Sequence, residues 1–247
     1  MRNAPKTVEM NSTFEINTNP TIENLNKIKT WLIEENRKTK QGFYCNWNVI
    51  ENSFQNKELI IFQNSDSIIG FMTWTNCELY ASIDIMEIEP NYRKKGFGKL
   101  FYDKVAEYFK SIDLIAVKLF CSPVSSEKFW KKMGFIKFPN RGYSESELTY
   151  FKPLIEINMP SENDFENKLE LWDLEPYQIN NTKPKWTWKI ETENLEFSKP
   201  ILYPCNRNWN LRLTKNNEVI KEDKVKYFST KDNEIELSPF LYIKRLS

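Results

Sequence analysis

The sequence predicts an α/β (α+β) fold in which a mixed sheet is flanked by helices, followed by a smaller, mostly-β domain. Three observations support this prediction. Apolar residues recur at steps of three and four in some segments, and alternate or run together in others. Both patterns interleave over residues 14–157. After a polar stretch at residues 158–167, almost every pattern is that of a strand. We therefore predict two domains, at residues 14–157 and 158–247.

The first clear element is a helix. The first dozen residues are polar and are expected to be loosely ordered. Pro20 and Thr21 then provide a start signal, and apolar residues follow at helical spacing as far as residues 38–42. The elements predicted next are a shorter helix at residues 47–55 and strands at residues 59–63, 68–75 and 79–88.

The second half of the first domain alternates helices and strands. We predict a helix at residues 96–110, a buried strand at 114–121, a short helix at 125–133, and closing strands at 135–139 and 148–157. In the second domain we predict strands at residues 186–190, 211–213, 219–220, 225–228 and 240–246, with a hairpin turn at 215–218.

Composition excludes several kinds of chemistry. The 247 residues include no histidine, which rules out a Ser-His-Asp triad and a His-ligated zinc. The 4 cysteines are far apart and form no CxxC pair, so we expect no metal site and no disulfide framework. A net charge of +1 does not favour nucleic acid as a partner. We find no signal peptide and no run of about 18 apolar residues, and we expect a cytoplasmic protein without a membrane span.

A basic, glycine-containing turn precedes the helix predicted at residues 96–110. Gly96 and Gly98 lie within a run that also contains Arg93, Lys94, Lys95 and Lys99. The first turn of a helix leaves N–H groups without partners and carries the positive end of the helix dipole. Glycines allow a phosphate to approach the backbone. The turn therefore predicts a phosphate site, and the alternative interpretation is a solvated basic loop.

Residues 93–98 (Arg-Lys-Lys-Gly-Phe-Gly) fit the motif Arg/Gln-x-x-Gly-x-Gly/Ala. The strand and turn at residues 83–92 and the segment 125–135, which ends in Gly-Phe, fit the same family pattern. On these segments the chain resembles the GNAT (N-acetyltransferase) superfamily over residues 14–157. The remaining part of the chain resembles no family that we can name.

The resemblance implies an N-acyltransferase that moves an acyl group, above all acetyl, directly from acetyl-CoA or another acyl-CoA to a primary amine. The pyrophosphate would lie on the N–H groups of residues 94–99, and the pantetheine arm would pair with residues 86–88. The Ile88 N–H would polarise the thioester carbonyl. The implied CoA-binding residues are Met86, Ile88, Arg93, Lys94, Lys95, Gly96, Phe97, Gly98, Lys99, Ser125 and Trp130.

The candidate catalytic residues are carboxylates, because histidine is absent. Asp84 lies where many members of the family carry an acidic residue, and Glu87 is the second candidate for the general base. In a regular strand these two side chains would face opposite sides. A bulge, common in this strand of the family, would change that. The alternative role for Asp84 is a bond to a neighbouring loop.

The chain departs from the family pattern at the position of the general acid. Trp130 occupies the place where many GNAT enzymes have tyrosine, and an indole cannot act as an acid near neutral pH. Water, Tyr92, Tyr143 or Cys121 would have to protonate the thiolate, or it would leave unassisted. Pro123 replaces a frequent CoA-contacting asparagine, for which Ser122 or Ser125 could substitute. A GNAT-fold module that binds CoA or a protein without catalysis therefore stays open as an alternative.

The predicted second domain has nearly balanced charges and several tryptophans. It would cover the acceptor side of the first domain, form a homodimer, or bind a protein or glycan partner. The tryptophans Trp172, Trp186, Trp188 and Trp209 are expected to be mainly structural.

Overall fold

A computed structural model describes residues 13–65, 67–145, 147–191, 196–228, 235–237 and 239–245. The first dozen residues, predicted to be loose, and Leu246, the end of the last predicted strand, lie outside this described part. The chain divides into two compact units, of which the first runs to Phe120 and includes Lys128–Gly134. The second contains Cys121–Glu127 and the chain from Phe135 onward.

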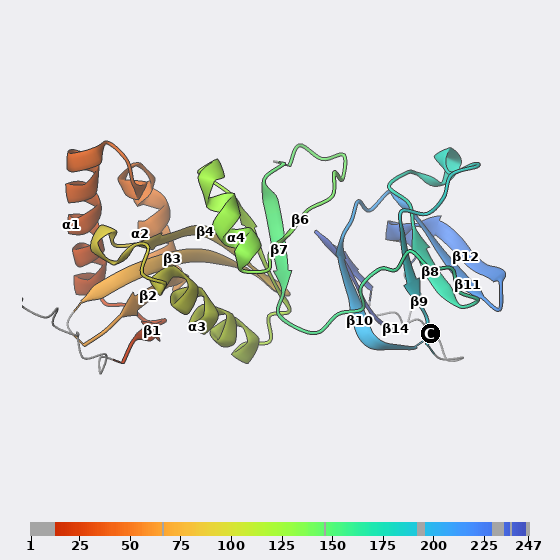
Figure 1. Cartoon of the computed structure of the whole chain (residues 1–247), viewed down its shortest axis with the longest axis horizontal. Coiled ribbons are helices and arrows are strands. Elements are labelled where there is room, and N and C mark those ends of the chain that lie inside the picture. Colours follow the sequence, from red (N-terminus) through yellow and green to blue (C-terminus); the bar gives the residue numbers. More distant parts are fainter. Residues whose placement is uncertain are drawn as a thin grey trace, which may run out of the picture. The chain divides into compact units, whose positions relative to one another are not determined.

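The first unit confirms the predicted order of helices and strands (Figure 1). Its elements are β1 (Glu15–Asn17), α1 (Ile22–Thr39), η1 (Phe43–Asn46), α2 (Trp47–Gln55), β2 (Leu59–Gln63), β3 (Ile68–Cys77), β4 (Tyr80–Ile88), η2 (Pro90–Tyr92), α3 (Phe97–Ser111), β5 (Ala116–Phe120) and, from Lys128, α4 (Glu127–Lys132). Strand β1 and the 3₁₀ helix η1 were not predicted, because elements of 3 and 4 residues are too short to show a period.

Helix α1 begins where its capping signal predicts. The Thr21 side chain accepts a hydrogen bond from the Asn24 N–H, and the Asn24 side chain bonds back to the Thr21 backbone. The helix ends at Lys40, which adopts a left-handed conformation. Its buried stripe packs with α2 against one face of the sheet, in a core that includes Phe71 and Ile85.

The strands of the first unit lie in the order β1-β2-β3-β4-β5. Neighbours are antiparallel except β4 and β5, which are parallel, so the sheet is mixed, as predicted. Helix α3 covers the face opposite α1 and α2 (Figure 1). There Phe101 stacks on Phe62 with ring centroids 5.1 Å apart, and Phe109 lies 4.7 Å from Trp74. The sheet is thus flanked by helices on both faces.

The second unit is mostly β (Figure 1). Its elements are η3 (Val124–Ser126), β6 (Ile136–Lys137), β7 (Thr149–Pro153), β8 (Lys168–Leu171), η4 (Pro176–Gln178), β9 (Trp186–Lys189), β10 (Glu196–Pro204), β11 (Asn210–Lys215), β12 (Glu218–Lys224), η5 (Val225–Tyr227), β13 (Ile235–Leu237) and β14 (Phe240–Arg245). Strands β12-β11-β8-β9 form a 4-stranded sheet, and β10-β14-β13 form a 3-stranded sheet.

One prediction for this unit was wrong. Residues 225–228 form the 3₁₀ turn η5, not a strand. Val225 and Phe228 are both buried, and the Phe228 N–H donates to the Val225 carbonyl. Residues three apart on a 3₁₀ turn point to the same side, so both can be buried. In the sequence, such a short segment with apolar ends looks like a short strand. Strands β8, β10 and β13 were not predicted.

The aromatic residues of the second unit form its core. Trp188 is fully buried, and Trp186 stacks on Trp209 at 5.4 Å, which agrees with a structural role. The hairpin between β11 and β12 turns at Asn216 and Asn217, which have φ values of 50° and 64°.

The segment 135–157 also packs within the second unit. The rings of Phe138 and Phe151 lie 5.7 and 5.5 Å from the Phe240 ring. The Arg141 guanidinium donates to the carbonyls of Cys205 and Pro239 at 2.8 Å each. The domain boundary after residue 157 stays a prediction. Within the described residues, no helix combines the length and the apolar character needed to cross a membrane.

Candidate active site

Strand β4 contains a bulge at the first candidate catalytic residue. Trp74 of β3 pairs with Ile83, and Thr73 pairs with Ile85, so Asp84 is an extra residue in the ladder. The bulge changes the alternation of side chains. Ile85 packs into the core beneath α1 and α2, and Glu87, two residues further, faces the same side. Asp84 and Glu87 therefore lie on one face of the sheet, the face that α1 and α2 cover.

Asp84 bonds to the neighbouring strand. The Thr75 hydroxyl donates to its carboxylate at 3.2 Å. Desolvation raises the pKa of Asp84, and the charge of Glu58 adds to the increase. The hydrogen bond from Thr75 and the charge of Lys118 oppose it. A carboxylate with a raised pKa is a better proton acceptor than an ordinary one.

Glu87 lies in a more enclosed environment, with a side chain that is 17% exposed. Burial raises its pKa from 4.5 to about 7, and the charge of Glu35 adds to the increase. Arg93, at 3.0 Å, and the Ile88 N–H, which donates to the carboxylate at 3.1 Å, act in the opposite direction. A carboxyl group that titrates near pH 7 is matched to general acid–base work.

Arg93, the first residue of the glycine-containing motif, has a side chain that is 37% exposed and bonds three neighbouring protein groups. Its guanidinium lies 2.7 Å from Glu35 of α1, and its Nε donates to the Ile88 carbonyl at 2.7 Å. It also pairs with Glu87. The sequence predicted a contact with phosphate for Arg93, but in this structure its bonds connect α1, the end of β4 and the following turn.

The turn before α3 provides backbone donors. Lys94 and Gly96 have φ values of 60° and 88°, and Gly96 is the N-cap of α3. Within the described part of the chain, the N–H groups of Phe97, Gly98 and Lys99 donate to no protein acceptor, as expected for a first helical turn. A side chain at Gly98 would place its Cβ 3.4 Å from the Phe129 ring, so this position is crowded as well.

The lysines of the turn differ in their surroundings. Lys94 is exposed. The Lys95 ammonium donates to the Asn91 carbonyl at 2.7 Å, and Lys99 pairs with Asp103 one turn along α3. These are solvent-exposed interactions, which a bound anion could replace at little cost.

The end of β4 has an open side. Its pairing with β5 reaches only as far as Ile83 and Leu119. On its other side the Glu89 N–H donates to the Ile69 carbonyl. The alternation of an antiparallel ladder then directs the backbone groups of Met86 and Ile88 away from β3. The Ile88 N–H donates to the Glu87 carboxylate, and the Arg93 Nε donates to the Ile88 carbonyl. The backbone groups of Met86 are left on the open side.

Residues 20–135 match the sequence model of the Acetyltransferase (GNAT) family. This chain contains a GNAT domain. No curated protein matches the chain.

Several solved structures are similar to part of this chain. A GNAT-family acetyltransferase from Staphylococcus aureus Mu50 is 16% identical, with a TM-score of 0.46, over 58% of this chain and 100% of that one. The PaiA N-acetyltransferase from Thermoplasma acidophilum, in complex with coenzyme A, is 16% identical, with a TM-score of 0.43, over 56% of this chain and 96% of that one. The ribosomal-protein-S18-alanine N-acetyltransferase from Escherichia coli is 12% identical, with a TM-score of 0.41, over 62% and 99%.

The predicted CoA-binding residues Phe97, Trp130 and Ser125 lie in three different environments. The Phe97 ring packs against the rings of Phe14 and Tyr92, with centroids 5.0 and 5.6 Å apart. Trp130 is 7% exposed and meets the Tyr102 ring edge-on at 5.8 Å, so it is part of the core. Ser125 lies in η3 of the second unit and is exposed.

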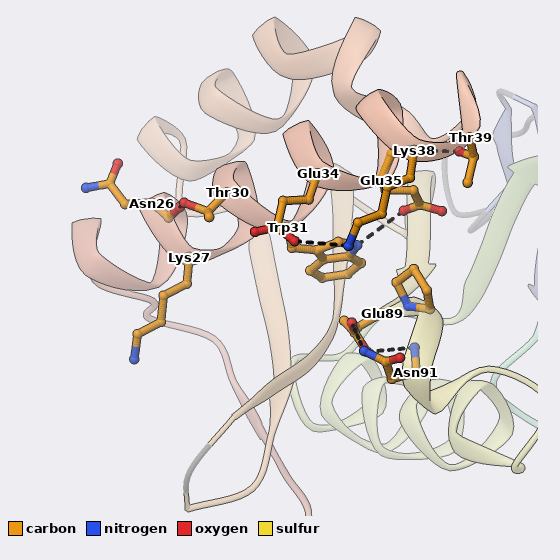
Figure 2. Close-up of a pocket in the computed structure, with 11 residues that line it drawn as sticks. Asn26, Lys27, Thr30, Trp31, Glu34, Glu35, Lys38, Thr39, Glu89 and Asn91 are labelled. Atoms are coloured by element: carbon orange, nitrogen blue, oxygen red, sulfur yellow. Dashed lines mark hydrogen bonds and ion pairs between the residues drawn. The ribbon is translucent and has the colours of Figure 1, made fainter.

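A cleft of about 610 Å³ opens between α1 and the turn after β4 (Figure 2). Its lining residues are Asn26, Lys27, Thr30, Trp31, Glu34, Glu35, Lys38, Thr39, Glu89, Pro90 and Asn91. Figure 2 shows Trp31 between the α1 carboxylates and the Glu89–Asn91 pair. The cleft thus offers an aromatic ring and carboxylates, a combination that suits a cationic amine.

Glu35 belongs to the candidate site but was not predicted from the sequence. It belongs to the buried stripe of α1, after Leu25, Ile28 and Leu32. A carboxylate at the next position of an apolar stripe is the signal that could have identified it, because buried charges are paired. Among the described residues, no cluster of carboxylates and thiols could hold a metal ion.

Proposed function

We propose that this protein is an acyl-CoA-dependent N-acyltransferase that moves an acetyl group from acetyl-CoA directly to a primary amine. The observation that carries the proposal is the arrangement of the 93–98 turn. The turn follows the open end of β4 and leads into the first N–H groups of α3. Its Arg93 pairs with the carboxylates of Glu35 and Glu87. These are the parts that an acyl-CoA and an amine require.

The residues present fit coenzyme A. The first-turn N–H groups of α3 without a protein acceptor, together with Lys94, would hold the pyrophosphate. The Met86 backbone would pair with the pantetheine arm. Acetyl-CoA, when bound, supplies an acyl group activated as a thioester. Ile88 could polarise the thioester carbonyl only after the Glu87 carboxylate leaves its N–H.

Glu87 is the first candidate for the general base, which reverses the order that the sequence suggested. Its pKa of about 7 lets it accept a proton from an ammonium group at neutral pH, whereas Asp84 is more exposed. The neutral amine then attacks the thioester carbonyl carbon. A C–N bond forms, the C–S bond breaks, the sulfur leaves with the electron pair as a thiolate, and the nitrogen loses its second proton to water or to the thiolate.

The thiolate would leave unassisted or take a proton from water. The buried Trp130 occupies the position of the usual tyrosine, and its indole cannot act as an acid. A thiolate is a good leaving group, since a thiol has a pKa of about 8.5. The reaction therefore does not need a protein acid.

The amine would approach from the cleft on the α1 side. Glu35 lines this cleft and shares Arg93 with Glu87. Trp31 and the carboxylates favour a positively charged acceptor. Small molecules, peptide N-termini and protein lysines all satisfy that condition. The second unit would restrict the choice among them, or would serve as a dimer or partner surface.

A thiol-release assay with acetyl-CoA and a panel of primary amines tests the proposal. We expect release that depends on the amine, and mass spectrometry should find the acetylated amine. Stabilisation by coenzyme A without release for any amine would contradict the proposal. That result would favour a module that binds CoA without catalysis, the alternative that the absence of a tyrosine at position 130 supports.

A further inference from the structure

The carboxylate of Glu35 is fixed from several directions. Its side chain is 5% exposed and bonds the guanidinium of Arg93 at 2.7 Å. The indole N–H of Trp31 donates to its other oxygen at 3.2 Å. The loop after α1 closes against it, because a Cβ at Gly42 would lie 3.2 Å from the Glu35 Cδ. Gly42 has a φ of 96°, which favours glycine in any case.

Two carboxylates share one guanidinium at this place. The Arg93 guanidinium lies 2.7 Å from the Glu35 carboxylate and 3.0 Å from the Glu87 carboxylate, and its Nε donates to the Ile88 carbonyl. The fork of an arginine can satisfy both carboxylates, but its single positive charge cannot neutralise both. Because Arg93 also pairs with Glu35, it stabilises the ionised form of Glu87 less than it would as the partner of Glu87 alone.

We propose that Glu35 is a positioning residue that keeps Glu87 able to act as a base, by holding Arg93 and by adding a negative charge beside it. Although Glu35 lines the acceptor cleft, its carboxylate is buried and bonds Arg93 and Trp31, so this role is exerted through Arg93 and not on a substrate. Without it, Arg93 would turn wholly to Glu87 and hold that carboxylate in its ionised, weakly basic form. This inference rests on the proposed function, in which Glu87 accepts the proton of the amine.

The other charged groups nearby do not provide this effect. The groups that act on the Glu87 carboxyl are Arg93 and Glu35. Asp84 lies on the same face of β4 but bonds Thr75. Lys38 lines the cleft and pairs with Glu34 at 3.4 Å, and Glu89 caps the Asn91 N–H. Glu23, exposed in the first turn of α1 and not among the residues that line the cleft, offers a control on the same helix.

The test is the pH dependence of kcat/KM in Glu35→Gln beside Glu23→Gln. Glutamine keeps the shape and an acceptor for Arg93 but removes the charge. We expect the midpoint of the acid limb to fall by about one pH unit in Glu35→Gln and to stay unchanged in Glu23→Gln. A purely structural role would lower the rate or the melting temperature without moving the midpoint, and an unmoved midpoint overturns the inference.

A second variant shifts the midpoint the other way. Arg93→Lys keeps the charge, but a single ammonium cannot hold Ile88, Glu35 and Glu87 together. We expect the midpoint to rise, because Glu87 loses attraction. This variant also tests the inference if Glu35→Gln does not fold, and a midpoint that stays or falls would overturn it.

A direct titration separates this inference from the proposed function. Carbon NMR of the Glu87 carboxyl needs no substrate and should show the same opposite shifts in the two variants. Shifts without any transferase activity would refute the proposed function and leave the inference about Glu35 intact. Transferase activity with an unshifted titration of Glu87 would refute the inference about Glu35 and leave the proposed function intact.

Discussion

The guanidinium of Arg93 lies 2.7 Å from the carboxylate of Glu35, and this ion pair joins the turn before α3 to helix α1. Arg93 begins the glycine-containing motif, yet its half-buried side chain bonds protein groups. It bonds Glu87 and the Ile88 carbonyl as well. We therefore propose two roles for the motif. Its glycines and backbone would form a cradle for the pyrophosphate, while its arginine would control the surroundings of the candidate base.

The first prediction concerns the base. Because Glu87 must lose its proton to act, kcat/KM should rise with pH along a limb whose midpoint is near 7. Glu87→Gln should lower kcat by about 10²- to 10⁴-fold and abolish the limb. Initial rates of thiol release between pH 5.5 and 9 provide the measurement. A limb that persists in the glutamine variant would assign the base elsewhere.

The second prediction concerns stability. Folding raises the pKa of Glu87 from 4.5 to about 7, so the folded state binds the proton more tightly than the unfolded state. The contribution of this residue is therefore fully present below pH 4.5 and is lost as the pH rises through 7. The loss is at most on the order of 3 kcal/mol. Urea unfolding of the wild type and Glu87→Gln should show a difference that changes over this range, and a constant difference would contradict the raised pKa.

The third prediction concerns Asp84. Asp84→Asn should slow turnover by about tenfold or less, leaving the affinity for coenzyme A and the limb near pH 7 unchanged. The reason is that Asp84 bonds Thr75 and is more exposed than Glu87. A parallel kinetic comparison with Glu87→Gln decides the order. If Asp84→Asn removes the limb and Glu87→Gln does not, the ranking derived from the sequence was right.

The fourth prediction concerns the cleft. Thr30 is exposed on α1 and lines the cleft, so Thr30→Trp should fill it and raise the KM of the amine by roughly tenfold. The affinity for coenzyme A should not change. Ile33→Trp serves as the control, because Ile33 is 41% exposed on the same helix but does not line the cleft. Equal amine KM values in the two variants would exclude the cleft as the acceptor site.

Much of the first unit could be predicted from sequence because its signals are local. Helix α2 and strand β2 have the predicted bounds, since apolar period and turn residues determine both.

The second unit was less predictable. Its Asn216–Asn217 turn could be predicted from residue types that tolerate positive φ. Strand β8 pairs with residues far away in the chain, and its short sequence carries no period that identifies it.

The site was only partly predictable. The motif located the turn that begins α3, and the family pattern raised the question of a bulge at Asp84, which the register of β3 and β4 answers. The pairing of Arg93 with Glu35 joins residues that are 58 positions apart. No local pattern encodes such a contact, because it depends on how α1 packs over the end of β4.

The most direct test of the account is the affinity of coenzyme A for the wild type and for Gly98→Asp, measured by calorimetry. An aspartate at this position would add bulk beside the Phe129 ring and a negative charge at the first turn of α3. Lys104→Gln, in the middle of the same helix, changes the net charge by the same amount and controls for charge alone, and thermal melting confirms that each variant is folded. We expect the wild type and Lys104→Gln to bind coenzyme A and folded Gly98→Asp not to bind it. Equal affinity in Gly98→Asp, or no binding by the wild type, would contradict the account.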